Sequence, residues 1–320
     1  MQQRYLGRTG LKVSRLGLGT LTWGRDTDEH EARDQLIAFT EAGGTLVDTA
    51  AGYGEGASEE LLGSLLGEVV ARDDVVIATK AGITRARGSR VTNASRGYLL
   101  STLDASLKRL GVDHVDLWQV HTWVDDTPLE ETLAALDFAV SSGRAAYVGV
   151  SNYSGWQSAQ AATWQRAVPG RTPLASNQVE YSLVNRRVEA EVLPAAEALG
   201  LGVLSWSPLG RGVLTGKYRH GTPADSRAAS PHFSSFVGGY LTERTRRIVE
   251  AVARAAEGLD WSPLEVALTW VRDRPGVTAP IVGARTAAQL RGSLTVEECE
   301  LPAQIVAALD DVSAEHSPVQ

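Results

Sequence analysis

The chain has 320 residues, 43% of them hydrophobic and 22% charged, and its formal net charge is −7. This composition is typical of a soluble globular protein, and the lack of a basic stripe interleaved with aromatic residues argues against nucleic acid as a partner. The single cysteine, Cys299, excludes an internal disulfide, no apolar run reaches membrane-spanning length, and no apolar leader opens the chain. We therefore expect a cytoplasmic protein that binds neither nucleic acid nor membranes.

The N-terminal residues predict a β-hairpin followed by a glycine-containing strand. Residues 3–14 have the pattern of a hairpin with a turn at Thr9-Gly10. The strand at residues 16–20 contains two glycines, which often mark a close approach of backbone or ligand. A helix then opens after Asp28, which is a suitable N-cap.

From this point the chain repeats a short apolar strand, a loop and an amphipathic helix. Alternating strands and helices favour a parallel sheet, and eight such units close into a barrel. A doubly wound open sheet is the alternative, but it usually carries a dinucleotide-binding fingerprint after its first strand, which this sequence lacks. We predict an α/β protein, a (β/α)8 TIM barrel with an N-terminal β-hairpin, in one domain spanning residues 1–320. The predicted strands are residues 16–20, 45–49, 75–80, 115–121, 146–151, 174–180, 202–207 and 278–282. The predicted helices are residues 29–42, 58–70, 96–110, 128–142, 156–166, 188–199, 242–259, 263–273 and 286–295.

Two long loops interrupt the repeat at residues 83–95 and 208–239. Both follow strands, so we expect them at the carboxyl ends of the barrel strands. Loops of this length inside a compact domain are usually functional or mobile, which makes both candidate lids.

Four side chains suited to acid–base chemistry lie at or just after the ends of three predicted strands: Asp48, Tyr53, Lys80 and His121. Each has a simpler structural explanation, such as an aspartate that bonds nearby amides, an aromatic anchor, a lysine that reaches solvent or a satisfied core histidine. The carboxyl ends of barrel strands all meet at one rim, where barrel enzymes hold their active sites. Delivery of all four to that rim favours a shared site.

Together these groups could protonate an alkoxide as it forms on a carbonyl carbon. The ordinary pKa of tyrosine, about 10, is too high for an efficient acid, so we expect Lys80 to lower the pKa of Tyr53 and Asp48 to keep Lys80 charged. A neutral His121 can hydrogen-bond the carbonyl oxygen. Because no side chain supplies a hydride, this reading requires a nicotinamide cofactor and a small-molecule carbonyl substrate.

Two other chemistries use the same residue types. The six histidines, at positions 30, 114, 121, 220, 232 and 316, have no His-x-His or Cys/His spacing, so we predict no metal site. A lysine that ends a barrel strand could also form a Schiff base, as in aldolases, and a lyase that uses Lys80 stays open at this point.

Glycine-rich segments after the seventh and eighth strands predict where the cofactor lies. Barrels commonly bind phosphate with these loops and a helix N-terminus. The backbone amides of Gly210 and Gly212, with the side chains of Arg211, Lys217 and Arg285, suit a pyrophosphate or a 2′-phosphate, although a charged surface loop would look the same.

Polar residues at the fifth and sixth strands suit the other end of the cofactor. Ser151, Asn152 and Gln178 could hold a carboxamide. Trp206 offers a flat face for stacking a nicotinamide ring.

In combination, these motifs resemble the aldo-keto reductase family from about residue 5 to residue 295. The similarity is strongest to the bacterial branch that resembles potassium-channel β subunits. The motifs, in order, are Leu16-Gly-Leu-Gly-Thr20, Asp48-Thr-Ala-x-x-Tyr53-Gly54, Ala78-Thr-Lys80, Asp116-Leu-Trp-Gln-Val-His121, Gly149-Val-Ser-Asn152, Asn177-Gln-Val-Glu-Tyr181, Ser207-Pro-Leu-Gly210 and Gly283-Ala-Arg-Thr286.

The resemblance implies a (β/α)8 barrel that reduces aldehydes or ketones with NADPH. It implies that Tyr53 donates the proton, that Lys80 and Asp48 tune it, and that His121 orients the carbonyl. Trp206 stands where the family usually has a stacking tyrosine. The alternative function is a regulatory or sensor subunit that binds NADPH and turns over very slowly.

The resemblance also implies contacts for the adenosine half of the cofactor. Arg285 would meet the 2′-phosphate and Gln289 would lie along the adenosine, while Gly292 and Ser293 stand where the family commonly has Glu or Asn. The predicted cofactor-binding residues are Thr20, Ser151, Asn152, Gln178, Trp206, Ser207, Leu209, Gly210, Gly212, Lys217, Gly283, Arg285 and Gln289.

Trp23 and Trp123, together with Tyr53 and His121, are predicted to form the carbonyl pocket, which would suit aromatic or hydrophobic substrates. The arginines of the first long loop, Arg85, Arg87 and Arg90, would instead favour an acidic or phosphorylated substrate if they fold inward; a solvated loop is the alternative. The exposed helices show no obvious apolar stripe, which favours a monomer over a homo-oligomer.

Overall fold

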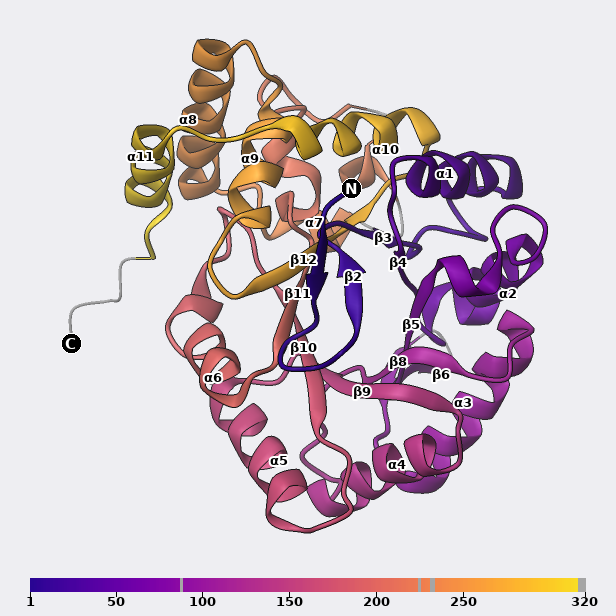
Figure 1. The fold of residues 1–320 in the computed structure, drawn as a ribbon. Coiled ribbons are helices and arrows are strands. Elements are labelled where there is room, and N and C mark those ends of the chain that lie inside the picture. The colour runs from indigo at the N-terminus through magenta and orange to yellow at the C-terminus, as the bar shows by residue number, and fades with distance from the viewer. Residues whose placement is uncertain (87–88, 224–225, 231–233, 316–320) are drawn as a thin grey trace.

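Eight parallel strands close into a barrel at the centre of the protein (Figure 1). The computed structural model describes residues 1–86, 89–223, 226–230 and 234–315. Around the barrel the strands follow the order β10-β11-β12-β3-β4-β5-β8-β9. They are β3 (Gly17–Gly19), β4 (Leu46–Asp48), β5 (Val76–Ala81), β8 (Val115–Val120), β9 (Ala145–Ser151), β10 (Leu174–Glu180), β11 (Gly202–Trp206) and β12 (Val277–Gly283). The predicted (β/α)8 barrel is confirmed.

Helices surround the strands on the outside of the barrel (Figure 1). Asp28 caps the first of them as predicted, accepting a hydrogen bond of 2.9 Å from the backbone amide of Glu31. The helices are α1 (Glu29–Glu41), α2 (Ala57–Leu65), α3 (Arg96–Leu110), α4 (Leu129–Ser141), α5 (Gly155–Ala167), α6 (Val192–Leu199), α7 (Ser234–Gly238), α8 (Glu243–Leu259), α9 (Pro263–Arg272), α10 (Ala287–Leu294) and α11 (Ala303–Ser313). Across the described residues, none of them has both the length and the apolarity that a bilayer span requires.

The structure differs from the sequence prediction at a few of these helices. Helix α2 ends five residues before the predicted boundary, close to Gly67, whose φ of +82° does not continue a helix. Helices α7 and α11 were not predicted, because the eight repeats account for the pattern without them. Helix α11 packs against α8 on the outside of the barrel (Figure 1).

Two apolar clusters hold the fold together. The larger one fills the space between the strands and the helices. The smaller one fills the barrel interior, where side chains from six strands meet two residues from the N-terminal hairpin. Its members include Leu6, Val13, Leu46, Ala78, Leu117, Ala175, Leu204 and Ala279.

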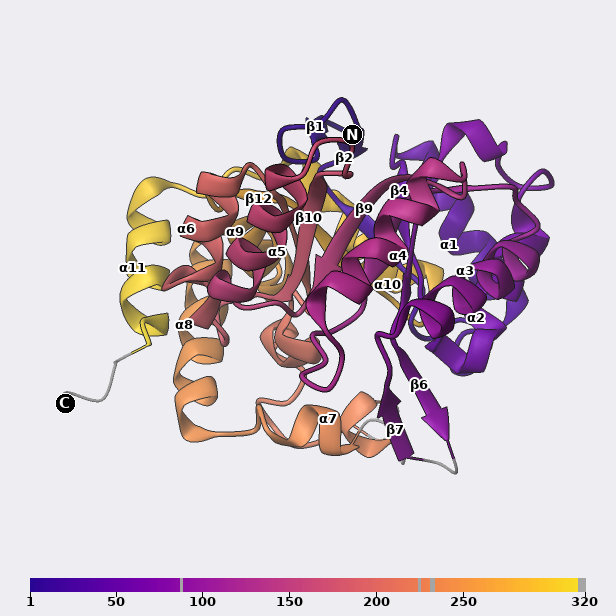
Figure 2. The same cartoon turned by 90° about the horizontal axis from the view of Figure 1, so that it is seen from below.

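The N-terminal hairpin closes the barrel at the amino ends of the strands (Figures 1 and 2). Strands β1 (Gln3–Tyr5) and β2 (Lys12–Ser14) pair antiparallel, as predicted. The predicted two-residue turn at Thr9-Gly10 is wrong, because six residues connect the strands and the left-handed residue is Gly7, at φ +58°. A longer connection lets Leu6 enter the barrel interior.

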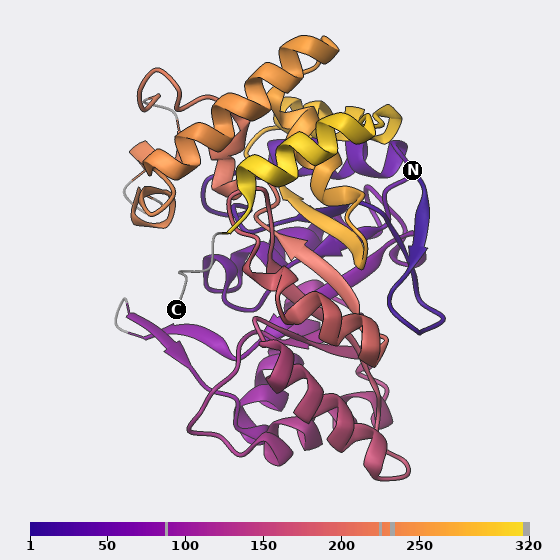
Figure 3. The same cartoon turned by 90° about the vertical axis from the view of Figure 1, so that its left-hand side faces the viewer.

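The two long predicted loops lie at the opposite end of the barrel from the N-terminal hairpin (Figure 2). The first contains a second hairpin, β6 (Ile83–Ala86) with β7 (Ser89–Thr92), which projects away from the barrel in Figure 3. The second contains a 3-10 helix, η4 (Gly210–Thr215), and α7. These segments stand where the barrel strands end, so they can shape a site at that rim.

We expect the substitution Gly7→Ala to destabilise the protein by about 3 kcal/mol, because it combines a left-handed φ with a steric clash. A Cβ at this position would lie 2.5 Å from the carbonyl oxygen of Gly200 and from the amide nitrogen of Gly202. Urea denaturation would measure the change in the free energy of unfolding.

Gly111→Ala is the matched control. Gly111 has a similar φ of +66°, but no atom lies within 4 Å of the added Cβ. It should cost only the backbone strain, about 1 kcal/mol. Equal losses in the two variants would show that the hairpin does not pack tightly against the β11 start.

Candidate active site

A cavity of about 830 Å³ opens at the carboxyl ends of the barrel strands. Its floor includes Asp48, the last residue of β4, together with Tyr53 and His121, which follow the ends of β4 and β8. The two long loops build much of its wall. The first contributes Ile83, Thr84 and Arg90, and the second contributes Pro208, Leu209, Arg211, Gly212, Thr215, Lys217 and Phe236. The apolar wall residues Ile83 and Phe236 were not predicted, because nothing local in a loop sequence fixes which side faces inward.

Lys80 lies at the centre of the predicted acid–base set and is 1% exposed. Its ammonium donates to Oδ2 of Asp48 at 2.6 Å, to the carbonyl oxygen of Thr49 at 2.8 Å and to the hydroxyl of Tyr53 at 3.5 Å. The strand register explains the first contact. Asp48 on β4 is level with Ala78 on β5, so Lys80 lies two residues further along β5 on the same face.

The surroundings of Lys80 keep it charged. Burial alone would lower the pKa of Lys80, but Asp48 and Tyr53 outweigh burial, so the pKa of Lys80 is raised. A Schiff-base lysine needs the opposite, a depressed pKa that leaves the amine neutral. This environment therefore argues against the lyase alternative.

Tyr53 lies between Lys80 and His121 at the cavity floor. Its ring centroid is 6.0 Å from that of His121, and the two rings meet edge to face. Burial raises the pKa of Tyr53, and the nearby charge of Lys80 offsets only part of that increase. The prediction that Lys80 lowers the pKa of Tyr53 is thus correct for the local interaction and wrong for the net shift, because desolvation of the phenolate is the larger effect.

His121 carries a neutral imidazole. Burial, together with the charges of Lys80 and Arg90, holds the pKa of His121 well below its ordinary value of 6.5. Its Nδ1 atom is buried and has no hydrogen-bond partner among the described residues. A proton on Nδ1 would be an unsatisfied buried donor, so we assign the tautomer with the proton on Nε2. That nitrogen can then donate to an oxygen in the cavity.

A buried hydrogen-bond network behind the floor holds the strand ends in place. Ser58, in the first turn of α2, donates to the carbonyl oxygen of Thr20 at 2.9 Å, and its hydroxyl lies 3.0 Å from that of Thr49. The next residue, Glu59, is fully buried, bonds the hydroxyl of Thr79 and forms an ion pair with Arg109 at 2.6 Å. The sequence analysis missed this network, because polar residues in a first helical turn look like ordinary capping residues.

The same network encloses Thr20, which the sequence analysis predicted to bind the cofactor. Thr20 is fully buried, and its hydroxyl lies 2.7 Å from that of Ser58. Thr20 is therefore not on the cavity wall, contrary to prediction. Gly210 is also buried, within η4, and it is not among the described lining residues either.

Ser151, Asn152, Gln178 and Trp206 form a connected polar rim beside His121. The side-chain amide of Asn152 donates to the backbone carbonyl of His121 at 2.9 Å and accepts from the indole nitrogen of Trp206 at 3.0 Å. Gln178 donates to Oδ1 of Asp48 at 2.8 Å. Asn152 adopts a left-handed φ of +58°, a conformation uncommon outside glycine that is often found at functional sites.

The segment after β11 and the start of α10 form the far wall of the cavity. Seven of the predicted cofactor-binding residues line it: Ser207, Leu209, Gly212, Lys217, Gly283, Arg285 and Gln289. Thr286 caps α10 by accepting from the amide of Gln289 at 3.2 Å, so the positive end of this helix lies at the cavity. A nicotinamide dinucleotide fits this donor set, with an amide-binding rim at one end and cationic side chains beside a helix N-terminus at the other.

Arg211 is diverted from the predicted phosphate role. Its guanidinium makes two hydrogen bonds of 2.9 Å to the carboxylate of Glu180 and a third to the carbonyl oxygen of Phe236. These bonds use the planar fork that would otherwise bind phosphate. The interaction instead ties α7 to the end of β10.

Comparisons with known proteins agree with this geometry. Residues 15–314 match the sequence model described as the Aldo/keto reductase family. The chain belongs to the aldo/keto reductase family. A Bacillus subtilis (strain 168) protein named "Uncharacterized oxidoreductase YrpG" is 39% identical over 98% of this chain and 96% of the relative.

Two further relatives carry more specific names. A rice (Oryza sativa subsp. japonica) protein named "Probable voltage-gated potassium channel subunit beta" is 38% identical over 89% of this chain and 87% of its own length. An Escherichia coli (strain K12) protein named "L-glyceraldehyde 3-phosphate reductase" is 36% identical over 91% of this chain and 86% of its own length. Family and relatives together make the chain an oxidoreductase of the carbonyl-reducing type.

Neither predicted tryptophan lines the cavity of this aldo/keto reductase. Trp23 is fully buried and its indole donates to Gln35 of α1 at 3.1 Å. Trp123 packs edge to face on Tyr153 and Trp156, with ring centroids 5.2 and 5.4 Å apart. Their packing partners set the direction of these two loop side chains, and their place in a substrate pocket stays a prediction. Of the loop arginines, Arg90 lines the cavity and Arg87 lies outside the described residues.

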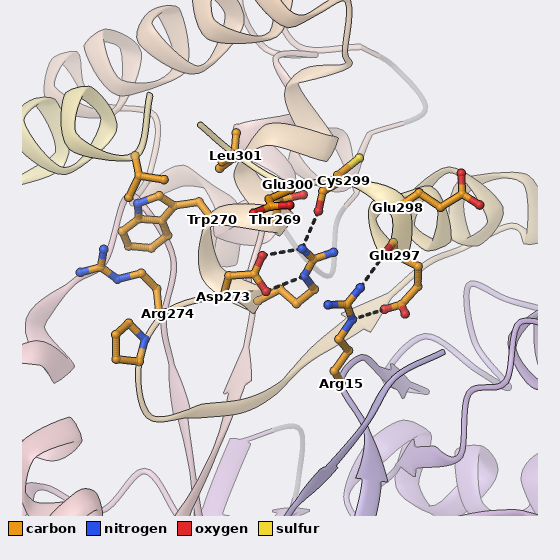
Figure 4. A pocket seen from close by; sticks show the side chains of 13 residues that line it. Arg15, Thr269, Trp270, Asp273, Arg274, Glu297, Glu298, Cys299, Glu300 and Leu301 are labelled. Carbon is orange, nitrogen blue, oxygen red and sulfur yellow. Dashed lines mark hydrogen bonds and ion pairs between the residues drawn. The ribbon is translucent and has the colours of Figure 1, made fainter. Parts of the chain in front are cut away.

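A second cavity, of about 660 Å³, lies between the end of α9 and the segment before α11 (Figure 4). Two of its arginines are held by neighbouring acids and carbonyls. Arg272 bonds both oxygens of Asp273 and the carbonyl oxygen of Cys299, and Arg15 bonds Glu297 at 2.8 Å. Burial raises the pKa of Cys299, so its thiol stays protonated and is a poor nucleophile.

The depressed pKa of His121 predicts a pH dependence of stability. In the unfolded aldo/keto reductase His121 takes a proton at about pH 6.5, whereas the folded protein binds it only at lower pH. Below about pH 6.5 the unfolded state therefore binds more protons than the folded state. As the pH is lowered through this range, the free energy of unfolding decreases by up to about 1.4 kcal/mol per pH unit.

The variant His121→Asn removes this contribution. We expect the stability advantage of the wild type over this variant to shrink as pH falls from about 7.5 to 5, measured by urea denaturation at each pH. His30→Asn is the control, since His30 is an exposed histidine of α1. Parallel pH curves for wild type and His121→Asn would contradict the assignment of a neutral buried imidazole.

Proposed function

We propose that the protein reduces the carbonyl group of an aldehyde or ketone to an alcohol with NADPH, and that Tyr53 donates the proton. The observation that carries this proposal is the position of the buried Lys80 ammonium, which contacts both Asp48 and Tyr53, while the Tyr53 ring packs edge to face on the neutral ring of His121. Family membership supports the same reaction.

The roles of the four residues follow from charge. NADPH, when bound, would supply the hydride that no side chain can supply. As negative charge develops on the carbonyl oxygen, the Tyr53 hydroxyl gives up its proton to it. The Lys80 ammonium stabilises the phenolate that forms, and Asp48 keeps Lys80 protonated and oriented. His121 donates from Nε2 to the same oxygen and so fixes its direction.

The cofactor would lie across the mouth of the barrel. Asn152 and Gln178, with Ser151, would hold the carboxamide at the rim beside His121. Trp206 would stack on the nicotinamide ring, and the hydrogen bond from its indole to Asn152 orients that surface. Lys217, Arg285 and the N-terminus of α10 would take the phosphates.

We extend the proposal to the whole protein as a single-domain, monomeric enzyme acting on a small-molecule carbonyl compound. Trp156 and Trp164 lie on α5 and Val168 directly follows it, while the other large exposed apolar side chains, Tyr5, Val91, Phe138, Leu241 and Val312, come from separate parts of the fold. Scattered exposed residues of this kind are ordinary on monomers. The single cysteine suits a reducing compartment, which supports a cytoplasmic location.

A second function is a sensor or regulatory subunit that binds NADPH tightly and turns over very slowly. The rice relative named as a probable potassium channel subunit beta supports it. This function predicts cofactor that stays bound through purification and a release step far slower than hydride transfer. Pre-steady-state kinetics separates the two functions. A reductase completes many turnovers in the time that a sensor subunit needs to release its cofactor once.

We expect Tyr53→Phe to reduce kcat for a reactive aromatic aldehyde by about 10²- to 10⁴-fold, the usual contribution of a positioned general acid. NADPH affinity should stay close to that of the wild type. Loss of NADPH absorbance measures turnover, and quenching of tryptophan fluorescence measures binding. Tyr5→Phe is the control, since Tyr5 is 57% exposed on the N-terminal hairpin. Unchanged turnover in Tyr53→Phe would contradict the proton-donor role.

We expect Arg285→Ala to weaken NADPH binding by about tenfold while leaving NADH nearly unaffected, because only NADPH carries the 2′-phosphate that an arginine binds. Arg291→Ala, an exposed arginine of α10 outside the described cavity lining, is the matched control. Titration of the wild type and each variant with NADPH and with NADH measures the ratio of the two dissociation constants. Equal weakening of NADPH and NADH would argue against a 2′-phosphate contact.

A further inference from the structure

Positive charge lies on two sides of the active-site cavity. The described lining residues include four cationic side chains, Arg90, Arg211, Lys217 and Arg285, and one acidic side chain, Asp48. Asp48 is neutralised by Lys80, and Arg211 is neutralised by Glu180. Arg90 therefore adds a positive charge to the cavity lining that no acidic side chain of the lining offsets.

The barrel order places these charges across from one another. Arg90 lies on β7, in the connection that leaves β5, and Lys217 lies in the connection that leaves β11. In the closed ring, β5 and β11 are four strands apart, which is opposite in a barrel of eight. Strand β8, which ends just before His121, is the direct neighbour of β5. Arg90 is thus on the side of the carbonyl-orienting histidine, away from the wall that suits cofactor phosphates.

Arg90 is available for a ligand. Its side chain is exposed, and no hydrogen bond or ion pair joins that side chain to another residue in the part of the chain that the structure describes. Its charge nevertheless acts on the cavity, since it contributes to the lowered pKa of His121, after burial and Lys80. The second hairpin, which carries Arg90, stands at the same end of the barrel as α7 (Figure 2).

We propose that Arg90 forms an anion-binding subsite on the substrate side of the cavity and that the enzyme prefers carbonyl compounds bearing a carboxylate or phosphate. The inference rests on the proposed carbonyl reduction. The planar guanidinium matches both anions with two parallel hydrogen bonds, and a partly enclosed site strengthens the attraction. An anionic group bound there would hold the reactive carbonyl between Tyr53 and His121.

The test compares anionic and neutral members of two substrate pairs in wild type, Arg90→Gln and Arg90→Lys. The pairs are para-carboxybenzaldehyde with its methyl ester, and glyceraldehyde phosphate with glyceraldehyde. We expect Arg90→Gln to lower the anionic-to-neutral ratio of kcat/KM by about tenfold, mainly through KM, with the neutral substrates unchanged. Arg90→Lys should keep part of the preference, since it keeps the charge but loses the fork.

Two controls separate this subsite from general charge effects. Arg8→Gln removes the same charge from an exposed position in the N-terminal hairpin, at the opposite end of the barrel, and should leave the ratio unchanged. Added salt should lower the ratio in the wild type and leave it flat in Arg90→Gln. If Arg90→Gln lowers the anionic-to-neutral ratio for only one substrate pair, that pair identifies whether the subsite binds carboxylate or phosphate.

The outcomes distinguish the two proposals. Turnover of the neutral aldehydes reports on carbonyl reduction itself, while the anionic-to-neutral ratio reports on Arg90. A ratio that Arg90→Gln leaves unchanged would overturn the subsite and leave the reductase intact. If the wild type reduces no aldehyde, calorimetric binding of the product alcohols of both pairs still tests the subsite. Equal affinity of wild type and Arg90→Gln for the anionic alcohols would then overturn it.

Discussion

The active site depends on one buried charge, the ammonium of Lys80. An ammonium taken out of water carries a large desolvation cost unless it is paired and hydrogen-bonded. Asp48 and the carbonyl oxygen of Thr49 meet that requirement from the neighbouring strand end. The remaining contact of Lys80, to the hydroxyl of Tyr53, points the charge at the group that we propose as the proton donor. In the proposed mechanism, the register of β4 and β5 is therefore a chemical requirement as well as a structural one.

The site combines a rigid floor with a wall built from long connections. Beneath the floor, Ser58 and Glu59 of α2 bond the hydroxyls of threonines at the ends of β4 and β5, so the strand ends that carry the acid–base groups cannot move independently. The walls come from the second hairpin and from the segment after β11. A fold of this kind can keep its chemistry while the walls change what the cavity accepts, since precise positioning is confined to the barrel.

Electrostatics divides the cavity into regions with different tasks. At the floor, Lys80 and Asp48 neutralise each other, which leaves a polar but nearly uncharged place for a carbonyl group. Burial keeps His121 neutral, so it can orient an oxygen without adding charge. The cationic side chains Arg90, Lys217 and Arg285 also line the cavity, where they can bind anionic groups without disturbing the proposed proton transfer.

The sequence by itself determined the barrel and singled out four candidate acid–base residues, because both leave local signals: strands of regular length, helices of regular period, and polar side chains at or shortly after strand ends. Tertiary structure decided what depends on packing partners far along the chain. It turned Trp23 toward Gln35 and Arg211 toward Glu180, and it enclosed Thr20 against Ser58. It also reversed the expected net pKa shift of Tyr53, since desolvation depends on everything that surrounds a side chain and no short motif encodes it.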